Sequence, residues 1–416
     1  MDKKVCVIAG ATTPFDYGPT GFESIEEGAV MCYHEIMKDV PDFTLRDADM
    51  MIYSHFSVHF GHQLAPEWII HDHLGLVGVP HFRVENGGNT AGSALYAAAL
   101  AIMSGHHKVI PIIGWETMDS VSQSQGSEFI AMASDTRYEL MVGGIYPIFY
   151  AAMANKFMKD NNLTEEDVAK IAVKNRNNAM DNPKTQWYRN EHQYITVEDV
   201  MNSRLISYPI KKYDCCLMTR GVAMVVICDE EYAKKVAPDN YVYIDGMGLS
   251  SCTIRAGDRL NFPGWTERYG PGYPELTEFA ACRNSAEAAY KTAGITNPRK
   301  EIQVMEIHDA FSTSEAQIYK ALGLCDKNTI KSFIQDGIAE LGGELPINPG
   351  GGLLGYGHPV GATGLMSLTE VFYQLNNMIP KKHLSKKSQV PNAEVGLINS
   401  HAGTGTSISN FIIRRK

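Results

Sequence analysis

The pattern of apolar and polar positions predicts short buried strands that alternate with amphipathic helices. In the first third of the chain, strand-like runs are VCVIAG, MMIYSH and VIPIIGW, and the stretches between them have helical spacing. The chain from residue 241 onwards repeats this order, with strand-like YVYIDGMG, IQVMEI and VGLINS around the helical TEFAACRNSAEAAYKTAG. Such alternation is typical of a layered α/β fold around a buried sheet.

The chain is predicted to contain two similar halves. Each half has a strand, a polar elbow and a helix in succession, as in RVENGGNTAGSALY and VMEIHDAFSTSEAQIY. We place the halves at residues 1–245 and 246–416. Residues from about 117 to 210 break the rhythm, and we expect them to be an inserted loop region of the first half that includes one amphipathic helix, TEEDVAKIAVKNRNNAMDNP. Insertions of this kind often carry substrate-facing residues.

Composition narrows the class of protein. The 416 residues are 44% hydrophobic and 20% charged, which suits a globular enzyme with a sizeable core, and no apolar run approaches the about 20 residues of a membrane span. A net charge of −10 without a basic stripe argues against nucleic acid as a partner. The start MDKKVCVIAG leads straight into a strand, so we expect no leader peptide and a cytoplasmic location. Eight scattered cysteines without a CxxC pair predict reduced thiols.

The first elbow looks like the place of a catalytic nucleophile, because the start of a helix stabilises negative charge. It contains Gly87 and Gly88, however, and neither Cys nor Ser occurs there before Ser93. Glycine cannot form an acyl-enzyme, because it has no nucleophilic side chain. The sequence therefore combines an anion-stabilising elbow with the absence of a nucleophile at its usual place.

Three stretches resemble one known family. They are HDAFSTSEAQIYKALGLC (308–325), INPGGGLLGYGHPVGATG (347–364) and NSHAGTGTS (399–407). In these stretches, and along essentially its whole length, the chain resembles the thiolases, specifically the sterol-carrier-protein-2-type branch. The resemblance implies a five-layered α/β/α/β/α sandwich of two similar halves with an inserted loop domain. It also implies a homodimer or higher assembly that makes or breaks a carbon–carbon bond in a coenzyme A (CoA) thioester, with no covalently bound cofactor.

The chain departs from the family pattern at the cysteines. Gly88 stands at the position of the nucleophilic Cys, Ala310 replaces the Cys of the HDCF motif, and His401 replaces the Cys of a C-terminal Cys-x-Gly. The resemblance implies that His308 and His358, which lies in the intact GHP motif, donate hydrogen bonds to the thioester oxygen. The backbone N–H groups of Gly88 and Gly403 match the family's second oxyanion site. We also expect Gly88 to enlarge the cavity.

Enolate stabilisation without a nucleophile fits a retro-aldol cleavage of a β-hydroxyacyl-CoA, which requires an acid/base group but no covalent intermediate. Nucleophile-free aldolases of this branch use tyrosines for proton transfer, and Tyr356 matches one such position. A second would be Tyr269 or Tyr273. His401 is a candidate proton shuttle. We expect no metal site, because the histidines at 55, 59, 62, 71 and 73 lack an HExxH motif or a set of carboxylates.

Two other functions stay open on the sequence. The first is an acyl-CoA C-acyltransferase, a thiolase with an unorthodox nucleophile. The second is a non-catalytic CoA-binding subunit. Because unusual members of this branch work with a small subunit that carries a zinc-finger-like segment and an OB-fold, the resemblance also implies a partner of that kind.

Overall fold

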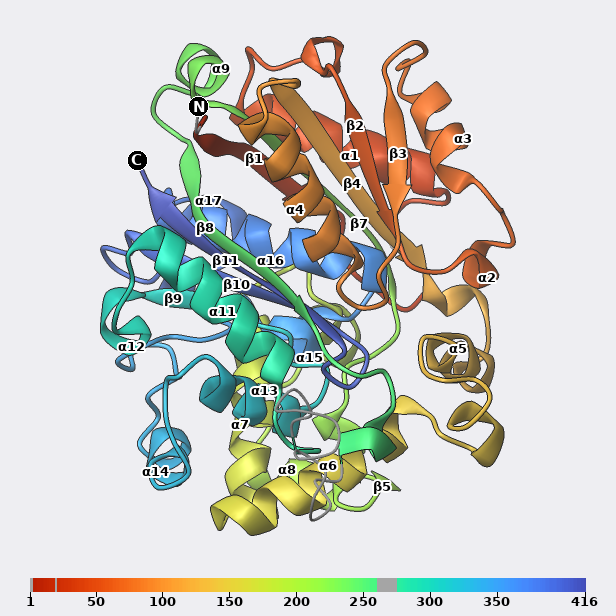
Figure 1. Ribbon diagram of the computed structural model, residues 1–416, viewed down its shortest axis with the longest axis vertical. Coiled ribbons are helices and arrows are strands. Elements are labelled where there is room, and N and C mark those ends of the chain that lie inside the picture. The colour runs from red at the N-terminus through yellow and green to blue at the C-terminus, as the bar shows by residue number, and fades with distance from the viewer. Residues whose placement is uncertain (1–2, 19–20, 260–274) are drawn as a thin grey trace.

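The computed structural model describes residues 3–18, 21–259 and 275–416 (Figure 1). The strands of the main sheet are β1 (Val5–Thr12), β2 (Met51–His55), β3 (His81–Val84), β4 (Val109–Thr117), β7 (Arg220–Asp229), β8 (Val242–Ser251), β9 (Val304–Glu306), β10 (Val395–Ala402) and β11 (Ser407–Arg415). A separate hairpin consists of β5 (Leu205–Ser207) and β6 (Ile210–Lys211).

Helices follow most strands, as the alternating pattern predicted. Those before β8 are α1 (Ile25–Asp39), α2 (Val58–Gly61), α3 (Pro66–His73), α4 (Thr90–Met103), α5 (Gln123–Ala131), α6 (Tyr146–Asn161), α7 (Glu165–Ala179), α8 (Val197–Asn202) and α9 (Glu230–Val236). Those after it are α11 (Ala280–Ala293), α12 (Pro298–Glu301), α13 (Ser312–Ala321), α14 (Ile330–Gln335), α15 (Gly352–Tyr356), α16 (Val360–Leu375) and α17 (Ile379–Lys382).

Within the described residues, nine strands form one mixed sheet in the order β3-β2-β4-β7-β1-β8-β11-β10-β9. The first five strands of this order lie in the first half of the chain and the last four form the second half, which begins with β8 at Val242, four residues before the predicted boundary. The halves are joined by a short antiparallel contact between β1 and β8, in which Cys6 pairs with Tyr243 and Val7 with Val242. Most of the central strands are buried throughout, which explains their continuous apolar runs.

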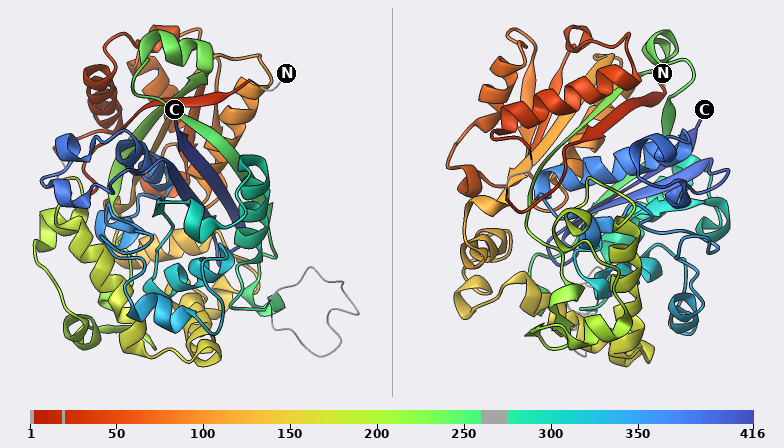
Figure 2. Two further views of the ribbon diagram at one scale, coloured as in Figure 1. Left: turned by 90° about the vertical axis from the view of Figure 1, so that its left-hand side faces the viewer. Right: turned by 180° about the vertical axis from the view of Figure 1, so that it is seen from behind.

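Helices cover both faces of each half-sheet and form the expected five layers (Figures 1 and 2). The middle layer consists of α4 and α16, which lie against each other and contact strands of both halves. The outer layers are formed by α1 on the first half and α11 on the second. The glycines of α16 make this packing possible: a Cβ on Gly361 would lie 2.6 Å from the Trp115 carbonyl oxygen, and one on Gly364 would lie 2.9 Å from the Ala91 Cβ. The predicted fold is confirmed.

The region expected to be an inserted loop is mostly helical. It contains α5 to α8 and the β5–β6 hairpin. The predicted amphipathic helix is α7, whose start is capped by Thr164 and Asp167 in a reciprocal capping box. The insertion packs through α7 on α13 and α15 of the second half. Residues from the first half thereby cover the elbows of the second half.

No helix in the described ranges combines the length and the apolar character needed to cross a lipid bilayer.

Candidate active site

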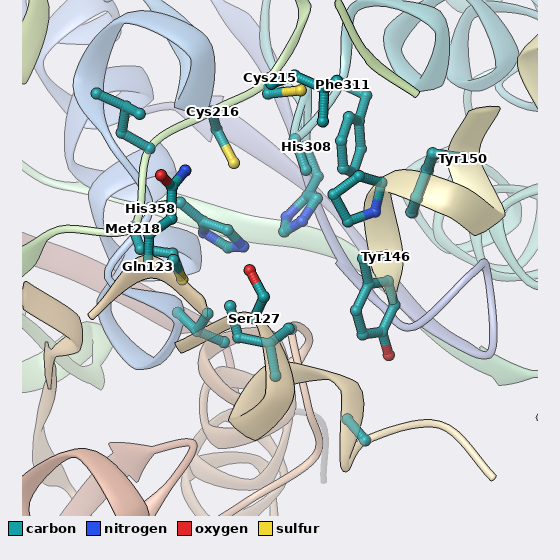
Figure 3. A pocket seen from close by; sticks show the side chains of 18 of the residues that line it. Gln123, Ser127, Tyr146, Tyr150, Cys215, Cys216, Met218, His308, Phe311 and His358 are labelled. Atoms are coloured by element: carbon teal, nitrogen blue, oxygen red, sulfur yellow. The ribbon is translucent and has the colours of Figure 1, made fainter. Parts of the chain in front are cut away.

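A pocket lies where the two elbows meet the insertion (Figure 3). Its empty volume is about 1230 Å³, open solvent at its mouth included. Segments far apart in sequence line this pocket. Five of the lining residues were predicted from the sequence as site residues: Gly88, His308, His358, His401 and Gly403. The fold therefore brings five of the eight predicted site residues to one pocket.

The three histidines come from three different elements. His308 follows β9, His358 lies two residues before the start of α16, and His401 lies near the end of β10. The His308 ring lies 4.9 Å from the ring of His358, edge to face, and 5.4 Å from that of His401, with the planes only 16° apart. Burial lowers the pKa of His358 and of His401 to about 3, and lowers the pKa of His308 well below its ordinary value. All three rings are therefore neutral near pH 7.

Hydrogen bonds indicate which nitrogen carries the proton in two of these rings. The Tyr150 hydroxyl donates to the Gly403 carbonyl oxygen at 2.9 Å, so its oxygen can accept the bond from His401 Nε2 at 3.1 Å. His401 is then protonated on Nε2. The Nδ1 atom of His358 is buried without a hydrogen-bond partner among the described residues. A buried N–H without a partner is rarer than a buried acceptor without one, so the His358 proton belongs on Nε2.

His308 differs from the other two histidines. Neither of its ring nitrogens makes a hydrogen bond within the described part of the chain, and neither is among the buried unpartnered atoms. One neutral imidazole offers one N–H donor and one lone pair. His308 can therefore both give and accept a proton in the pocket.

Asp309 positions the segment that carries His358. Its carboxylate accepts a 2.6 Å hydrogen bond from the backbone N–H of Leu353 in the first turn of α15. The approach is so close that a Cβ on Gly352, which has φ +56°, would lie 2.4 Å from Asp309 Oδ2. Burial and the nearby charge of Glu315 raise the pKa of Asp309 to about 7. Asp309 does not line the pocket, so its role is to position the neighbouring segment.

The insertion is fixed to the site by α7. Asn175 Nδ2 donates to Asp309 Oδ2 at 2.6 Å and to Glu315 Oε2 at 2.5 Å. Lys174 Nζ forms a buried ion pair with Glu315 Oε1 at 2.9 Å. This polar network includes Asp309, the residue after His308, and connects the inserted helix α7 to the second half.

The place of the missing nucleophile is filled by backbone. A Cβ built on Gly88 would lie 2.3 Å from the His401 carbonyl oxygen and 3.3 Å from the Ala402 Cα. The expectation that Gly88 enlarges the cavity is therefore wrong, because the end of β10 occupies the space that a side chain would need.

The structure does not bring Tyr356 into the pocket. Tyr356 is 1% exposed, and its hydroxyl lies 3.0 Å from Thr12 Oγ1 on β1. Its ring packs edge to face on Phe15 at 4.9 Å. Its position on α15 turns the side chain towards β1 and away from His358. The alternative residues Tyr269 and Tyr273 lie outside the described residues.

Residues without a recognisable motif complete the pocket. Tyr146 and Tyr150 come from α6, and Tyr150 stacks on Phe311 at 4.4 Å. Two adjacent thiols, Cys215 and Cys216, also line it, and in Figure 3 the Cys216 sulfur points towards the histidines. Burial raises the pKa of Cys216 to about 12 and that of Cys215 well above its ordinary value. The Cys-Cys doublet before β7 was the only sequence feature that could have drawn attention to them.

No group of three or more His, Cys, Asp or Glu residues is arranged to hold a metal ion in the ranges that the structure describes.

Two similar halves, a middle layer of two helices and a histidine-lined pocket at the elbows define a thiolase-like protein. The chain belongs to the thiolase family, in its sterol-carrier-protein-2-type branch: residues 5–231 match the thiolase N-terminal domain and residues 269–415 match the thiolase C-terminal domain.

Curated relatives agree with this assignment. The chain is 33% identical to the acetyl-CoA acetyltransferase of Methanothermobacter thermautotrophicus over 83% of each chain. It is 32% identical to the benzoylsuccinyl-CoA thiolase subunit BbsB of Thauera aromatica over 74% of each chain. Human sterol carrier protein 2 is 28% identical over 81% of this chain and 59% of the relative.

Solved structures share the fold. The Ltp2-ChsH2(DUF35) aldolase superposes with a TM-score of 0.80 at 24% identity, covering 100% of this chain and 98% of that one. Human mitochondrial 3-ketoacyl-CoA thiolase superposes with a TM-score of 0.68 at 14% identity, covering 100% and 99%.

Proposed function

We propose that the chain cleaves or forms a carbon–carbon bond in a CoA thioester, and that the reaction is a retro-aldol cleavage of a β-hydroxyacyl-CoA. The observation that carries this proposal is the pocket itself: three neutral histidines surround a position where the nucleophile is glycine and has no room for a side chain. The names of the relatives support a CoA thioester as substrate, and the aldolase neighbour is consistent with the reaction.

The chemistry can be assigned to the described residues. The lone pair of His308 takes the proton of the β-hydroxyl, the Cα–Cβ bond breaks, and a ketone or aldehyde leaves. The electron pair of that bond moves onto the thioester as an enolate. The Nε2–H of His358, together with backbone N–H groups of Gly88 and Gly403, stabilises the enolate oxygen. The proton held by His308, with His401 beside it, then returns to Cα.

A second function has one observation in its favour, the presence of Cys216 in the pocket. In an acyltransferase, that thiol would take the acyl group as a thioester. Because burial raises its pKa to about 12, the thiol is protonated near pH 7 and is a poor nucleophile. No described cation or ring forms a hydrogen bond with the Cys216 sulfur that would favour the thiolate.

The test combines product analysis with a search for an adduct. Incubation with a β-hydroxyacyl-CoA is expected to give a carbonyl compound and a shortened acyl-CoA, while intact mass spectrometry finds no acyl group on the protein. Cys216→Ala is expected to retain turnover within about threefold, because the thiol remains protonated. A stoichiometric adduct that disappears in Cys216→Ala would instead establish the acyltransferase.

The position of CoA is proposed from two cations at the mouth of the pocket. Arg204 and Lys212 line both this pocket and an adjoining hollow of about 560 Å³, which also contains Asn202 and Tyr213. We propose that the pantetheine arm enters between the two cations and that they hold the phosphates. Cations are well suited to phosphate recognition because they contribute charge and several donors.

Arg204→Ala and Lys212→Ala are each expected to raise the Kd of CoA about threefold to fivefold, because an exposed charge contributes up to about 1 kcal/mol. The effect should shrink at high salt, where exposed charges are screened. Calorimetry measures the Kd, and Lys38→Ala, on the exposed surface of α1, is the matched control. An unchanged Kd in both variants would exclude this position for the phosphates.

We also propose a homodimer or higher assembly, together with a small partner subunit. The edge strand β3 exposes Phe82, and the neighbouring α3 exposes Trp68 and Ile69, at 42%, 66% and 45%. An exposed strand edge beside large apolar side chains favours pairing with another chain. Because two similar proteins are named as a subunit or as a complex, the turnover assay is run on the chain alone and with a co-expressed small subunit.

A further inference from the structure

One face of α5 forms the wall of the pocket opposite the histidines. Gln123, Ser127 and Ile130 are spaced four and three residues apart, which places them on the same side of the helix, and all three line the pocket. In Figure 3 the Ser127 hydroxyl points across the pocket towards His308 and His358. The proposed reaction uses none of these three side chains.

Helix α5 is fixed in place by a capping hydrogen bond and by packing against neighbouring side chains. The Ser122 side chain caps its start by accepting from the Gln125 N–H at 3.3 Å. On the face away from the pocket, Phe129 packs edge to face on Phe60 at 5.6 Å. A Cβ on Gly126 would lie 2.9 Å from the Met218 sulfur, so the helix sits close to its neighbour. The position of Ser127 is therefore set by packing, which is what a recognition site requires.

The two polar side chains of this wall have unused hydrogen-bonding capacity. Neither the Ser127 hydroxyl nor the Gln123 amide makes a hydrogen bond with another residue in the part of the chain that the structure describes. Their neighbours in the wall are apolar, namely Phe56, Ile130, Ala133, Met218 and Val360. A few polar groups in a mostly apolar pocket fix the orientation and identity of a ligand.

We propose that Gln123 and Ser127 form an acyl-group subsite that hydrogen-bonds oxygen substituents of the acyl chain. Ser127 faces the histidines, so it would form a hydrogen bond with an oxygen near the reacting carbons. Gln123, one helical turn away, would form a hydrogen bond with a second polar group. The preferred substrate is then a CoA thioester with an oxygen-substituted acyl chain. This inference rests on the proposed function, because it needs the acyl group to lie in this pocket.

The test uses CoA thioethers, which lack the thioester carbonyl and cannot react. Calorimetry compares S-butyl-CoA with S-(4-hydroxybutyl)-CoA, whose hydroxyl lies one carbon beyond the β-hydroxyl assigned to His308. The wild-type protein is expected to bind the hydroxylated ether about fivefold to tenfold more tightly, the effect of one hydrogen bond. Ser127→Ala is expected to remove this preference and leave the Kd of S-butyl-CoA unchanged. The double variant Gln123→Met/Ser127→Ala tests the contact proposed for Gln123, and its probe is an ether that carries a terminal carboxamide.

Two controls separate recognition from folding. Ser124→Ala, the same change on the exposed side of α5, should keep the preference. Ser127→Thr, which retains the hydroxyl, should keep it too. If the wild-type protein does not distinguish the ethers, or Ser127→Ala still does, the subsite is excluded and the proposed function stands. If neither ether binds to the wild-type protein, alone or with its partner, the proposed function itself fails.

Discussion

Replacing His358 with alanine is expected to lower kcat for carbon–carbon cleavage by about 10²–10³-fold and to leave the Kd of the CoA thioester nearly unchanged. The removal of one preorganised oxyanion donor typically has an effect of this size. The structure favours His358 as that donor, because its Nδ1 is buried without a partner and its proton therefore lies on Nε2. Its lowered pKa of about 3 means that the ring donates this bond as a neutral group.

The measurement is steady-state turnover of a β-hydroxyacyl-CoA, with thermal unfolding to show that the variant is folded. His34→Ala, an exposed histidine of α1, is the matched control and should retain full activity. Activity of His358→Ala within about threefold of wild type would contradict the catalytic role. If the wild-type protein shows no measurable turnover and His358→Ala only loses CoA binding, the result would instead favour a non-catalytic CoA-binding subunit.

Gly88→Cys is expected to destabilise the protein by about 3 kcal/mol and to fail as a thiolase. The added Cβ would lie 2.3 Å from the His401 carbonyl oxygen, and backbone cannot rotate away as a side chain can. Insertion of even one methylene into a filled interior commonly costs 1–3 kcal/mol. The resulting shift of β10 would also displace His401 and Gly403, so cleavage activity should fall together with stability.

Denaturant unfolding and intact mass spectrometry after exposure to acyl-CoA check this expectation. Gly61→Cys is the matched control, because the Cβ there meets nothing closer than 4.0 Å. A Gly88→Cys protein with wild-type stability and a stoichiometric acyl adduct would show that the place of the nucleophile is open. The proposed cleavage without a covalent intermediate would then lose its main support.

The fold was predicted best from the sequence at positions where a family motif is also needed for close packing. The glycines of GHPVGATG are needed because α16 lies in the middle layer against backbone on several sides, so the same residues that identify the family also build the fold. Alternating apolar runs predicted the strands correctly, because buried strands leave little choice of residue. The three pocket histidines lie in the three stretches that resemble the family, so the sequence also identified them.

Orientation and remote contacts could not be predicted in this way. Tyr356 is adjacent to the GHP motif, yet its side chain turns to Thr12, a contact that spans most of the chain. Tyr150 and Ser127 reach the pocket from a region whose spacing follows no motif. The error at Gly88 has a similar cause: a missing side chain leaves a cavity only if the surrounding backbone stays away, and the sequence does not show how near β10 comes.

The buried contact between Asn175 and Asp309 limits how the two parts of this enzyme can change independently. The insertion supplies the surface that would select an acyl group. Its helix α7 also forms a hydrogen bond with the Asp309 carboxylate, which positions the GHP segment. A chimera that borrowed this region from a relative would have to bring compatible residues at 174 and 175, or the graft would alter reaction rate as well as substrate choice. The exchange of this region between relatives is therefore constrained by two buried side chains that do not line the pocket.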